Sequence, residues 1–257
     1  MGSVPISGTV YLVGAGPGAA DLLTLRAARL LGEAGVVFHD ALVGEEILSL
    51  APGAEKIAVG KRCGRHSTAQ RFINKRLADA AARHRVVVRL KGGDPMLFGR
   101  AHEEIAYLQA KNIPVEIVPG ITAALGASAE LQVSLTRRGV ARSVVFATTR
   151  AAPGEAPSSW LAAVRAADTA VLYMASHDAQ LVRDQLLAAG MRADMPVAIA
   201  ESVSLDEKTH AGFLRDLPAL AARCAGGPAL LLIGEVFGAI STKPVDISVE
   251  SRLYRTS

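Results

Sequence analysis

The feature of this sequence that most constrains its fold is a regular alternation of short apolar runs with longer amphipathic stretches. In the first half, the β-rich runs lie at residues 10–14, 36–38, 56–59, 86–90 and 115–118. The helical patterns between and after them lie at residues 22–34, 45–50, 68–83, 97–111 and 121–131. Strands that alternate with helices favour a parallel sheet with helices on its faces. We therefore predict an α/β protein with a mostly parallel sheet.

After Arg138 the pattern changes. Further strands are predicted at residues 143–148, 169–174, 196–200 and 229–233, with a short edge strand at 209–213. Helices are predicted at 178–189 and 214–223. We place a domain boundary near residue 140. This gives an N-terminal α/β domain (1–140), a C-terminal α/β domain (141–240) and a tail (241–257).

Composition indicates a soluble protein with a proper core. Half of the 257 residues are hydrophobic and a fifth are charged. The longest apolar run, 229–240, is interrupted by Glu235 and is too short to span a bilayer. Residues 1–13 lack the basic region of a secretory signal, so we expect a cytoplasmic protein. Cys63 and Cys224 lie far apart and are interpreted as free thiols in a reducing compartment.

Positive charge is concentrated in one segment. Residues 60–100 contain eleven Lys or Arg against two acids, a formal +9 in a chain whose total is +4. Such a block favours an anionic partner, although part of it at helical spacing fits a solvated face. No aromatic stacking platform is interleaved with these charges, so we do not expect nucleic acid to be that partner.

The first candidate ligand loop is Gly14-Ala15-Gly16-Pro17-Gly18, directly after a predicted strand. Glycines let the backbone turn sharply and approach a ligand closely. A dinucleotide fingerprint needs G-x-G-x-x-G, and here the third glycine comes one residue early. Pro17 also removes an amide donor. The pattern disfavours a pyrophosphate site and leaves open a tight turn beside a nucleoside.

Asp40 follows the strand at 36–38, about twenty residues after the glycine loop. Three interpretations fit its position. It could hold ribose hydroxyls, as in a Rossmann fold, or act as a catalytic carboxylate at the carboxyl end of a strand. It could also simply form a turn or cap a helix. Spacing alone does not choose among them.

Two further loops follow predicted strands. Lys91-Gly92-Gly93-Asp94-Pro95 ends in an Asp-Pro pair typical of a helix start, but that start does not need the two glycines before it. Val118-Pro119-Gly120-Ile121-Thr122 opens a helix of small residues. We expect the three glycine loops to form one ligand site. The six His show no i, i+4 pairing with acids of the kind that zinc sites need, so no metal site is predicted.

Taken together, several segments resemble the uroporphyrinogen-III C-methyltransferases, which are S-adenosylmethionine-dependent tetrapyrrole methylases. They are VGAGPG (13–18), HDALV (39–43), GKR (60–62), RLKGGDPMLFGR (89–100), VPGITAA (118–124) and LTRRG (135–139). The resemblance extends to about Gly238 and is to the stand-alone form, without a dehydrogenase/chelatase extension. It implies two α/β domains of the tetrapyrrole methylase type, with the cofactor in the interdomain cleft, and a homodimer.

The resemblance also implies a role for individual residues. Asp40 would be the proton acceptor and Lys61 a proton donor. S-adenosylmethionine, which leaves as S-adenosylhomocysteine, would contact Pro17, Gly92, Gly93, Asp94, Leu97, Thr122, Ala123, Met174 and Val203. The substrate carries eight carboxylates, for which we expect a clamp of Arg62, Arg65, His66, Arg100, Arg137 and Arg138.

The function implied is methylation of uroporphyrinogen III at C2 and C7, giving precorrin-2 for sirohaem or cobalamin synthesis. Three alternatives remain open at this point. They are a methylase acting on a later corrin precursor, a dinucleotide-binding oxidoreductase using the first glycine loop, and a non-catalytic protein that binds anionic tetrapyrroles.

Overall fold

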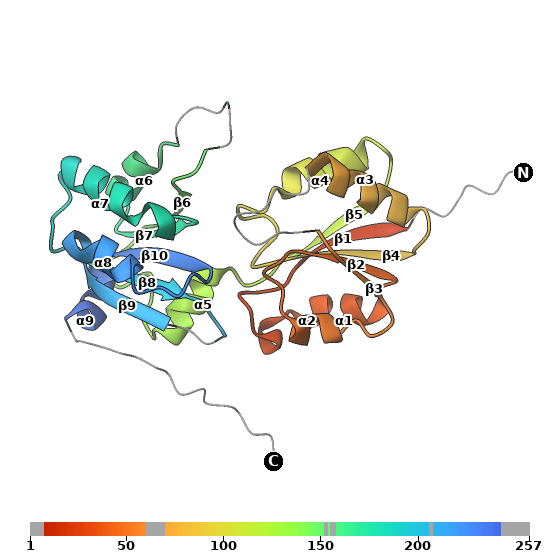
Figure 1. Cartoon of the computed structure of the whole chain (residues 1–257), viewed down its shortest axis with the longest axis horizontal. Coiled ribbons are helices and arrows are strands. Elements are labelled where there is room, and N and C mark those ends of the chain that lie inside the picture. The colour runs from red at the N-terminus through yellow and green to blue at the C-terminus, as the bar shows by residue number, and fades with distance from the viewer. Residues whose placement is uncertain (1–7, 60–69, 152–153, 155–157, 206–207, 243–257) are drawn as a thin grey trace, which may run out of the picture. The chain divides into compact units, whose positions relative to one another are not determined.

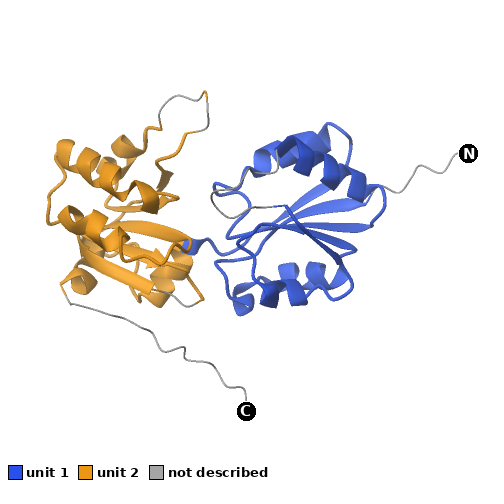
Figure 2. Cartoon of the chain, in the orientation of Figure 1, with its two compact units in different colours: residues 1–123 blue, residues 124–257 orange. Residues whose placement is uncertain are grey.

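The computed structural model (Figure 1) describes residues 8–59, 70–151, 154, 158–205 and 208–242. The chain divides into two compact units, residues 1–123 and 124–257 (Figure 2). This division comes before the boundary near residue 140 predicted from the sequence. The segment from residue 124 to residue 140 thus belongs to the second unit. At its start, the amide of Ala124 donates to the Tyr173 hydroxyl of that unit at 3.2 Å.

The first unit contains a five-stranded sheet in the order β3-β2-β4-β1-β5 (Figure 1). Its strands are β1 (Thr9–Gly14), β2 (Val36–His39), β3 (Glu55–Ala58), β4 (Val86–Lys91) and β5 (Val115–Val118). Every neighbouring pair is parallel, which confirms the predicted parallel sheet. All five strands therefore end at the same edge, and the loops that leave them begin side by side.

Helices cover both faces of this sheet (Figure 1). They are η1 (Ala20–Leu22), α1 (Leu25–Glu33), α2 (Glu45–Ser49), α3 (Gln70–Ala81) and α4 (Ala101–Gln109). Side chains of a strand alternate between faces. Accordingly, Val10 and Leu12 of β1 pack in the core formed with α3 and α4, whereas Val13 packs in the core formed with α1 and α2. The apolar runs of the sequence are strands buried on both faces.

The start of α4 differs from the prediction. The sequence predicted a helix over 97–111, with Asp94 and Pro95 at its start, but α4 begins at Ala101. Phe98 and Arg100 have left-handed backbone, with φ of 53° and 55°, which a helix does not contain. Asp94 instead accepts hydrogen bonds from the amides of Met96 and Gly120. The Asp-Pro pair belongs to a loop.

The second unit contains a mixed sheet in the order β6-β7-β10-β8-β9. Its strands are β6 (Val144–Thr148), β7 (Thr169–Tyr173), β8 (Pro196–Glu201), β9 (Lys208–Phe213) and β10 (Ala229–Gly234). Only the β6–β7 pair is parallel, and the other three pairs are antiparallel. The predicted edge strand at 209–213 is confirmed as β9.

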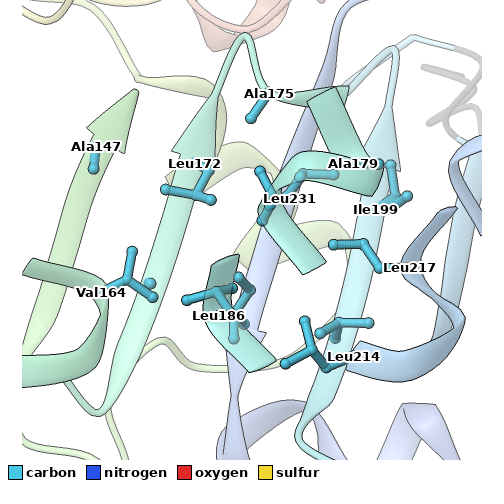
Figure 3. Close-up of a cluster of buried hydrophobic side chains, with 14 of the residues drawn as sticks. Ala147, Val164, Leu172, Ala175, Ala179, Leu186, Ile199, Leu214, Leu217 and Leu231 are labelled. Atoms are coloured by element: carbon cyan, nitrogen blue, oxygen red, sulfur yellow. The ribbon is translucent and has the colours of Figure 1, made fainter. Parts of the chain in front are cut away.

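Helices of the second unit are α5 (Ala123–Glu130), α6 (Trp160–Ala166), η2 (Ser176–Asp178), α7 (Ala179–Ala188), η3 (Leu214–Asp216), α8 (Leu217–Ala221), η4 (Glu235–Phe237) and α9 (Gly238–Ser241). One core cluster joins the sheet to α6, α7 and α8 (Figure 3). Leu172, Leu231 and Ile199 of the sheet contribute to it, as does Leu186 of α7. Within the described residues, no helix is both long and apolar enough to cross a membrane.

The α7 helix offers a matched pair of leucines for testing this core. Leu186 is fully buried, whereas Leu181 on the same helix is 50% exposed. Leu186→Ala should lower the free energy of unfolding by about 2–5 kcal/mol, because it leaves a cavity. Leu181→Ala should change it by only about 0.5 kcal/mol. Denaturant titrations measure both values, and equal losses would contradict the assigned face of α7.

Candidate active site

The candidate site is built on the edge where the parallel strands of the first unit end. Gly14 ends β1, Lys91 ends β4 and Val118 ends β5, and these strands are neighbours in the order β4-β1-β5. Asp40 directly follows β2, which pairs with β4 on its other side. The three glycine loops and Asp40 therefore leave one edge of the sheet, as the sequence predicted. In open α/β sheets this edge is where ligands bind.

Backbone hydrogen bonds join the first two glycine loops. The Gly16 amide donates to the Gly93 carbonyl at 3.2 Å, and the Gly93 amide donates to the Gly16 carbonyl at 2.7 Å. Both glycines have positive φ, 72° and 68°, a conformation that residues with a Cβ rarely adopt. The loops after β1 and β4 thus form a single backbone surface.

The third loop packs directly against the first two. A Cβ at Gly120 would lie 2.3 Å from the Gly93 carbonyl oxygen and 2.8 Å from Gly14 Cα. Both contacts are shorter than real Cβ atoms show, so Gly120 is needed for close approach. The Asp94 carboxylate adds a hydrogen bond across the same junction, accepting from the Gly120 amide at 2.9 Å. Asp94 therefore holds the β4 and β5 loops together.

Asp40 is anchored by a buried arginine. Its Oδ1 accepts from Arg89 Nη2 at 2.5 Å, and its backbone amide donates to the Leu90 carbonyl. The Asp40 side chain is 28% exposed, whereas that of Arg89 is only 4% exposed. The buried arginine therefore fixes one side of the carboxylate, and the other side remains open to solvent.

Arg89 is in turn held by Glu104, which extends from α4 and is completely buried. Its Oε1 accepts from Arg89 Nε at 3.1 Å and from Gln70 Nε2 at 3.1 Å. Its Oε2 accepts from Lys91 Nζ, also at 3.1 Å. Asp40, Arg89, Lys91 and Glu104 thus form a buried network of two cations and two anions.

Burial lowers the pKa of Lys91 below its ordinary value, and the nearby Arg89 charge lowers it further. The carboxylates of Glu104 and Asp40 oppose this shift without reversing it. Lys91 ends β4 directly before Gly92, the first glycine of the second loop. Its buried ammonium pairs with Glu104 next to the start of that loop.

Arg100, predicted to bind substrate, is exposed and already paired. Its Nε and Nη2 donate to the two carboxylate oxygens of Glu103 at 2.7 and 2.8 Å. This bidentate pair holds the pKa of Glu103 below its usual range. A substrate carboxylate at Arg100 would have to share or displace Glu103.

Apolar side chains are exposed around the glycine loops. Leu42, Met96 and Phe98 have 60%, 60% and 40% of their surface exposed. Leu42 lies beside the second loop, since a Cβ at Gly92 would be 3.3 Å from Leu42 Cβ. Exposed apolar groups of this size beside buried charges are typical of a surface that binds a ligand or partner.

In the second unit, Met174 follows β7, and Val203 lies two residues after β8. Both strands are antiparallel to β10, so they end at the same edge of their sheet. Met174 is 41% exposed and has φ of 58°, while Val203 is buried between Ser202 and Ser204, which also have positive φ. Strained backbone of this kind is concentrated at functional sites.

The other predicted residues divide into three groups. Pro17, Leu97, Thr122 and Ala123 are half-buried on or next to the loops of the first unit. Arg137 and Arg138 are exposed in a turn of the second unit, where the Arg137 and Ala141 backbones are hydrogen-bonded. The remaining predictions fall on residues outside the described part of the chain: Lys61, Arg62, Arg65 and His66.

Three residues of the buried network were not among the predicted site residues: Arg89, Lys91 and Glu104. A signal for two of them was present in the sequence. The run Val86-Val87-Val88-Arg89-Leu90-Lys91 predicts a strand, and a central strand of a parallel sheet is buried on both faces. Charges on such a strand must be paired inside the protein.

Comparison with known proteins agrees with this geometry. Residues 9–218 match the family of Tetrapyrrole (Corrin/Porphyrin) Methylases. The uroporphyrin-III C-methyl transferase of Thermus thermophilus, solved in complex with S-adenyl homocysteine, is 38% identical, with a TM-score of 0.79 over 90% of this chain and 100% of that one. A cobalt precorrin-4 methyltransferase is 26% identical with the same TM-score over 89% of this chain and 95% of its own.

Curated relatives include Siroheme synthase 1 of Klebsiella pneumoniae, which is 45% identical over 232 residues, 90% of this chain. The siroheme synthase of Pseudomonas fluorescens is 44% identical over 233 residues, again 90% of this chain. The chain spans about half the length of these relatives, 49% and 50%. The fold and the strand-end site define a two-unit α/β methyltransferase. The chain belongs to the tetrapyrrole methylase family.

Glu104 can be tested with its exposed neighbour as the control. Glu104→Gln should lower the free energy of unfolding by about 3–5 kcal/mol, because two buried cations lose their shared anion. Glu103→Gln removes an exposed pair and should cost no more than about 1 kcal/mol. Urea denaturation measures the difference. Equal small losses would show that the network is not needed for folding.

The lowered pKa of Lys91 predicts a pH dependence of stability. In the window between its lowered folded pKa and the ordinary 10.5, the unfolded chain binds more protons than the folded one. The free energy of unfolding of the wild type, minus that of Lys91→Met, should therefore rise with pH, by at most about 1.4 kcal/mol per unit. Lys75→Met is the control, because pairing with Asp79 raises the Lys75 pKa instead. A flat difference for Lys91 would contradict the assigned shift.

Proposed function

We propose that this chain transfers methyl groups from S-adenosylmethionine to ring carbons of uroporphyrinogen III, at C2 and then C7. The product would be precorrin-2, for sirohaem or cobalamin synthesis. The observation that carries the proposal is Asp40, a carboxylate anchored by buried Arg89 next to the joined glycine loops. The similarity to the Thermus uroporphyrin-III C-methyl transferase over that enzyme's whole length supports the choice of substrate.

The residues of the first unit fit an S-adenosyl cofactor. Among the described residues, the first atom that a Cβ at Gly93 would meet is Thr122 Cα, at 3.9 Å. The Gly93 α-carbon is therefore not covered by packed backbone, in contrast to Gly14, whose Cβ would lie 2.5 Å from Gly120 Cα. A nucleoside or an amino acid moiety could approach the backbone closely here. We assign its contacts to Pro17, Gly92, Gly93, Asp94, Leu97, Thr122, Ala123, Met174 and Val203.

When bound, S-adenosylmethionine supplies an electrophilic methyl group on a sulfonium, and the transfer is an in-line displacement that needs no metal ion. The contribution of the protein is mainly to hold the two reactants in line. The rigidly joined loops after β1, β4 and β5 suit this task, since they are fixed by backbone hydrogen bonds and close glycine contacts.

Asp40 would accept the proton that the ring must lose after a methyl group has been added. Pyrrole rings of the reduced macrocycle are electron-rich, and attack on the methyl group leaves a cationic ring. The anionic carboxylate would stabilise this cation and then remove the proton. Arg89 would act as a positioning residue, because it fixes Oδ1 of Asp40, and Glu104 would hold Arg89.

Binding of the substrate would rest on its carboxylates and its flat apolar body. We assign the carboxylates to Arg62, Arg65, His66, Arg100, Arg137 and Arg138, and a proton-donor role to Lys61. The exposed Leu42, Met96 and Phe98 would contact the macrocycle. As in the resemblance, we propose a cytoplasmic homodimer that binds neither nucleic acid nor a membrane.

An anaerobic assay with uroporphyrinogen III and methyl-labelled S-adenosylmethionine tests the function. A product that is heavier by two methyl groups is expected. If S-adenosylhomocysteine binds but no methyl is transferred, the acceptor is another tetrapyrrole, as for the cobalt precorrin-4 methyltransferase. Failure to bind the cofactor would exclude the proposal, and protection by NADH would favour the oxidoreductase alternative.

Asp40→Asn tests the catalytic carboxylate. Asparagine retains an oxygen that can accept from Arg89 but cannot take up the proton. We expect kcat to fall about 100- to 10,000-fold, with S-adenosylhomocysteine affinity nearly unchanged. Asp79→Asn is the control, since the exposed Asp79 carboxylate pairs with the exposed Lys75 on α3. Wild-type turnover in Asp40→Asn would remove Asp40 from the mechanism.

A further inference from the structure

Three side chains of metal-binding type lie together in the second unit, in a cluster that their sequence spacing does not reveal. They are Glu201 at the end of β8, His210 on β9 and Cys224 after α8. One ligand atom from each lies within 4.8 Å of the others. Glu201 and His210 are 2% and 8% exposed, whereas Cys224 is half-buried. The cluster has two enclosed members and one that solvent can reach.

The Glu201 carboxylate is held in place by backbone amides. Its Oε2 accepts from the Ala225 amide at 2.9 Å, and its Oε1 accepts from the Gly227 amide at 2.5 Å. A Cβ at Gly227 would lie 3.1 Å from Glu201 Oε1 and 2.5 Å from Ser202 Oγ, so a larger residue there would crowd this approach. Carboxylates that ligate metals are commonly oriented by such outer hydrogen bonds. Each oxygen keeps a second lone pair for a ligand.

Cys224 supplies the sulfur of the cluster. A divalent metal would bind the sulfur as thiolate, with the thiol proton released to solvent.

We propose that Glu201, His210 and Cys224 form a zinc-type cation site. Zinc is bound by thiolate, imidazole and carboxylate, often through three protein ligands with a fourth position open to water. Around a tetrahedral zinc ion these atoms lie roughly 3.5 Å apart, given metal–ligand distances of about 2.0–2.3 Å. Binding of the ion would draw together the three atoms, which lie within 4.8 Å of one another. The proposal does not depend on the methyl-transfer chemistry proposed above.

Cobalt titration of the full chain tests the proposal directly. Co²⁺ takes the place of zinc in such sites and reports a sulfur ligand through a near-ultraviolet charge-transfer band. The chain has two cysteines, so Cys63→Ser leaves Cys224 as the only thiol. We expect this single-thiol variant to bind one equivalent of Co²⁺, to show the band, and to lose it when Zn²⁺ is added.

Two further variants assign the ligands. Cys224→Ser should abolish the charge-transfer band while circular dichroism shows a folded protein. His210→Gln should weaken cobalt affinity at least about tenfold, since even outer-shell changes cost about 10–100-fold. The proposal is overturned if the Cys63→Ser variant binds no cobalt, or binds it without the band. The amide-held Glu201 would then be only a clamp for the turn at 225–227.

Discussion

The completely buried carboxylate of Glu104 makes three elements of the first unit depend on one another. It extends from α4, accepts from Arg89 and Lys91 of β4, and accepts from Gln70 at the start of α3. Removing one partner from such a group leaves an uncompensated charge, which costs more than the pair contributes when complete. Asp40 completes the balance as the second anion. The packing of α4 on the sheet and the direction of the candidate catalytic carboxylate therefore have the same electrostatic origin.

A second constraint, purely steric, acts on the neighbouring strand ends. Gly14 and Gly120 approach each other and the Gly93 carbonyl more closely than any side chain would allow. Because β4 lies between β1 and β2, its end takes part in both constraints: Lys91 belongs to the charge network, and Gly93 belongs to the joined loops. Only two peptide bonds separate Lys91 from Gly93, so a change in the network would be transmitted directly to the loop surface. Parallel strands make this possible, since they bring all these ends to one edge.

Much of the architecture could be predicted from the sequence, because the periodicity of apolar residues and the glycine and proline residues that end strands are local properties. All ten strands of the described residues were predicted, including the edge strand β9, and the glycine loops were correctly placed at strand ends. The predicted start of α4 was wrong. Asp94-Pro95 matches a helix cap locally, but the Asp94 carboxylate accepts a hydrogen bond from the Gly120 amide, 26 residues away. Glu104 was missed for a similar reason. Next to Glu103 on a helix it has no local sign of burial, and only the fold brings it to Arg89 and Lys91.

Several residues other than glycine have strained, left-handed backbone, which the surrounding fold must be stable enough to maintain. Phe98, Arg100, Met174, Ser202 and Ser204 all have φ between 53° and 62° without being glycine. Each such residue costs on the order of 1–3 kcal/mol and persists only when its surroundings impose it. All five lie in segments that follow strands, and two of them, Arg100 and Met174, are predicted to contact substrate and cofactor, respectively. Flexible loops would relax this strain. Rigid ones retain it, and a reaction that requires two reactants in line is served by rigid loops.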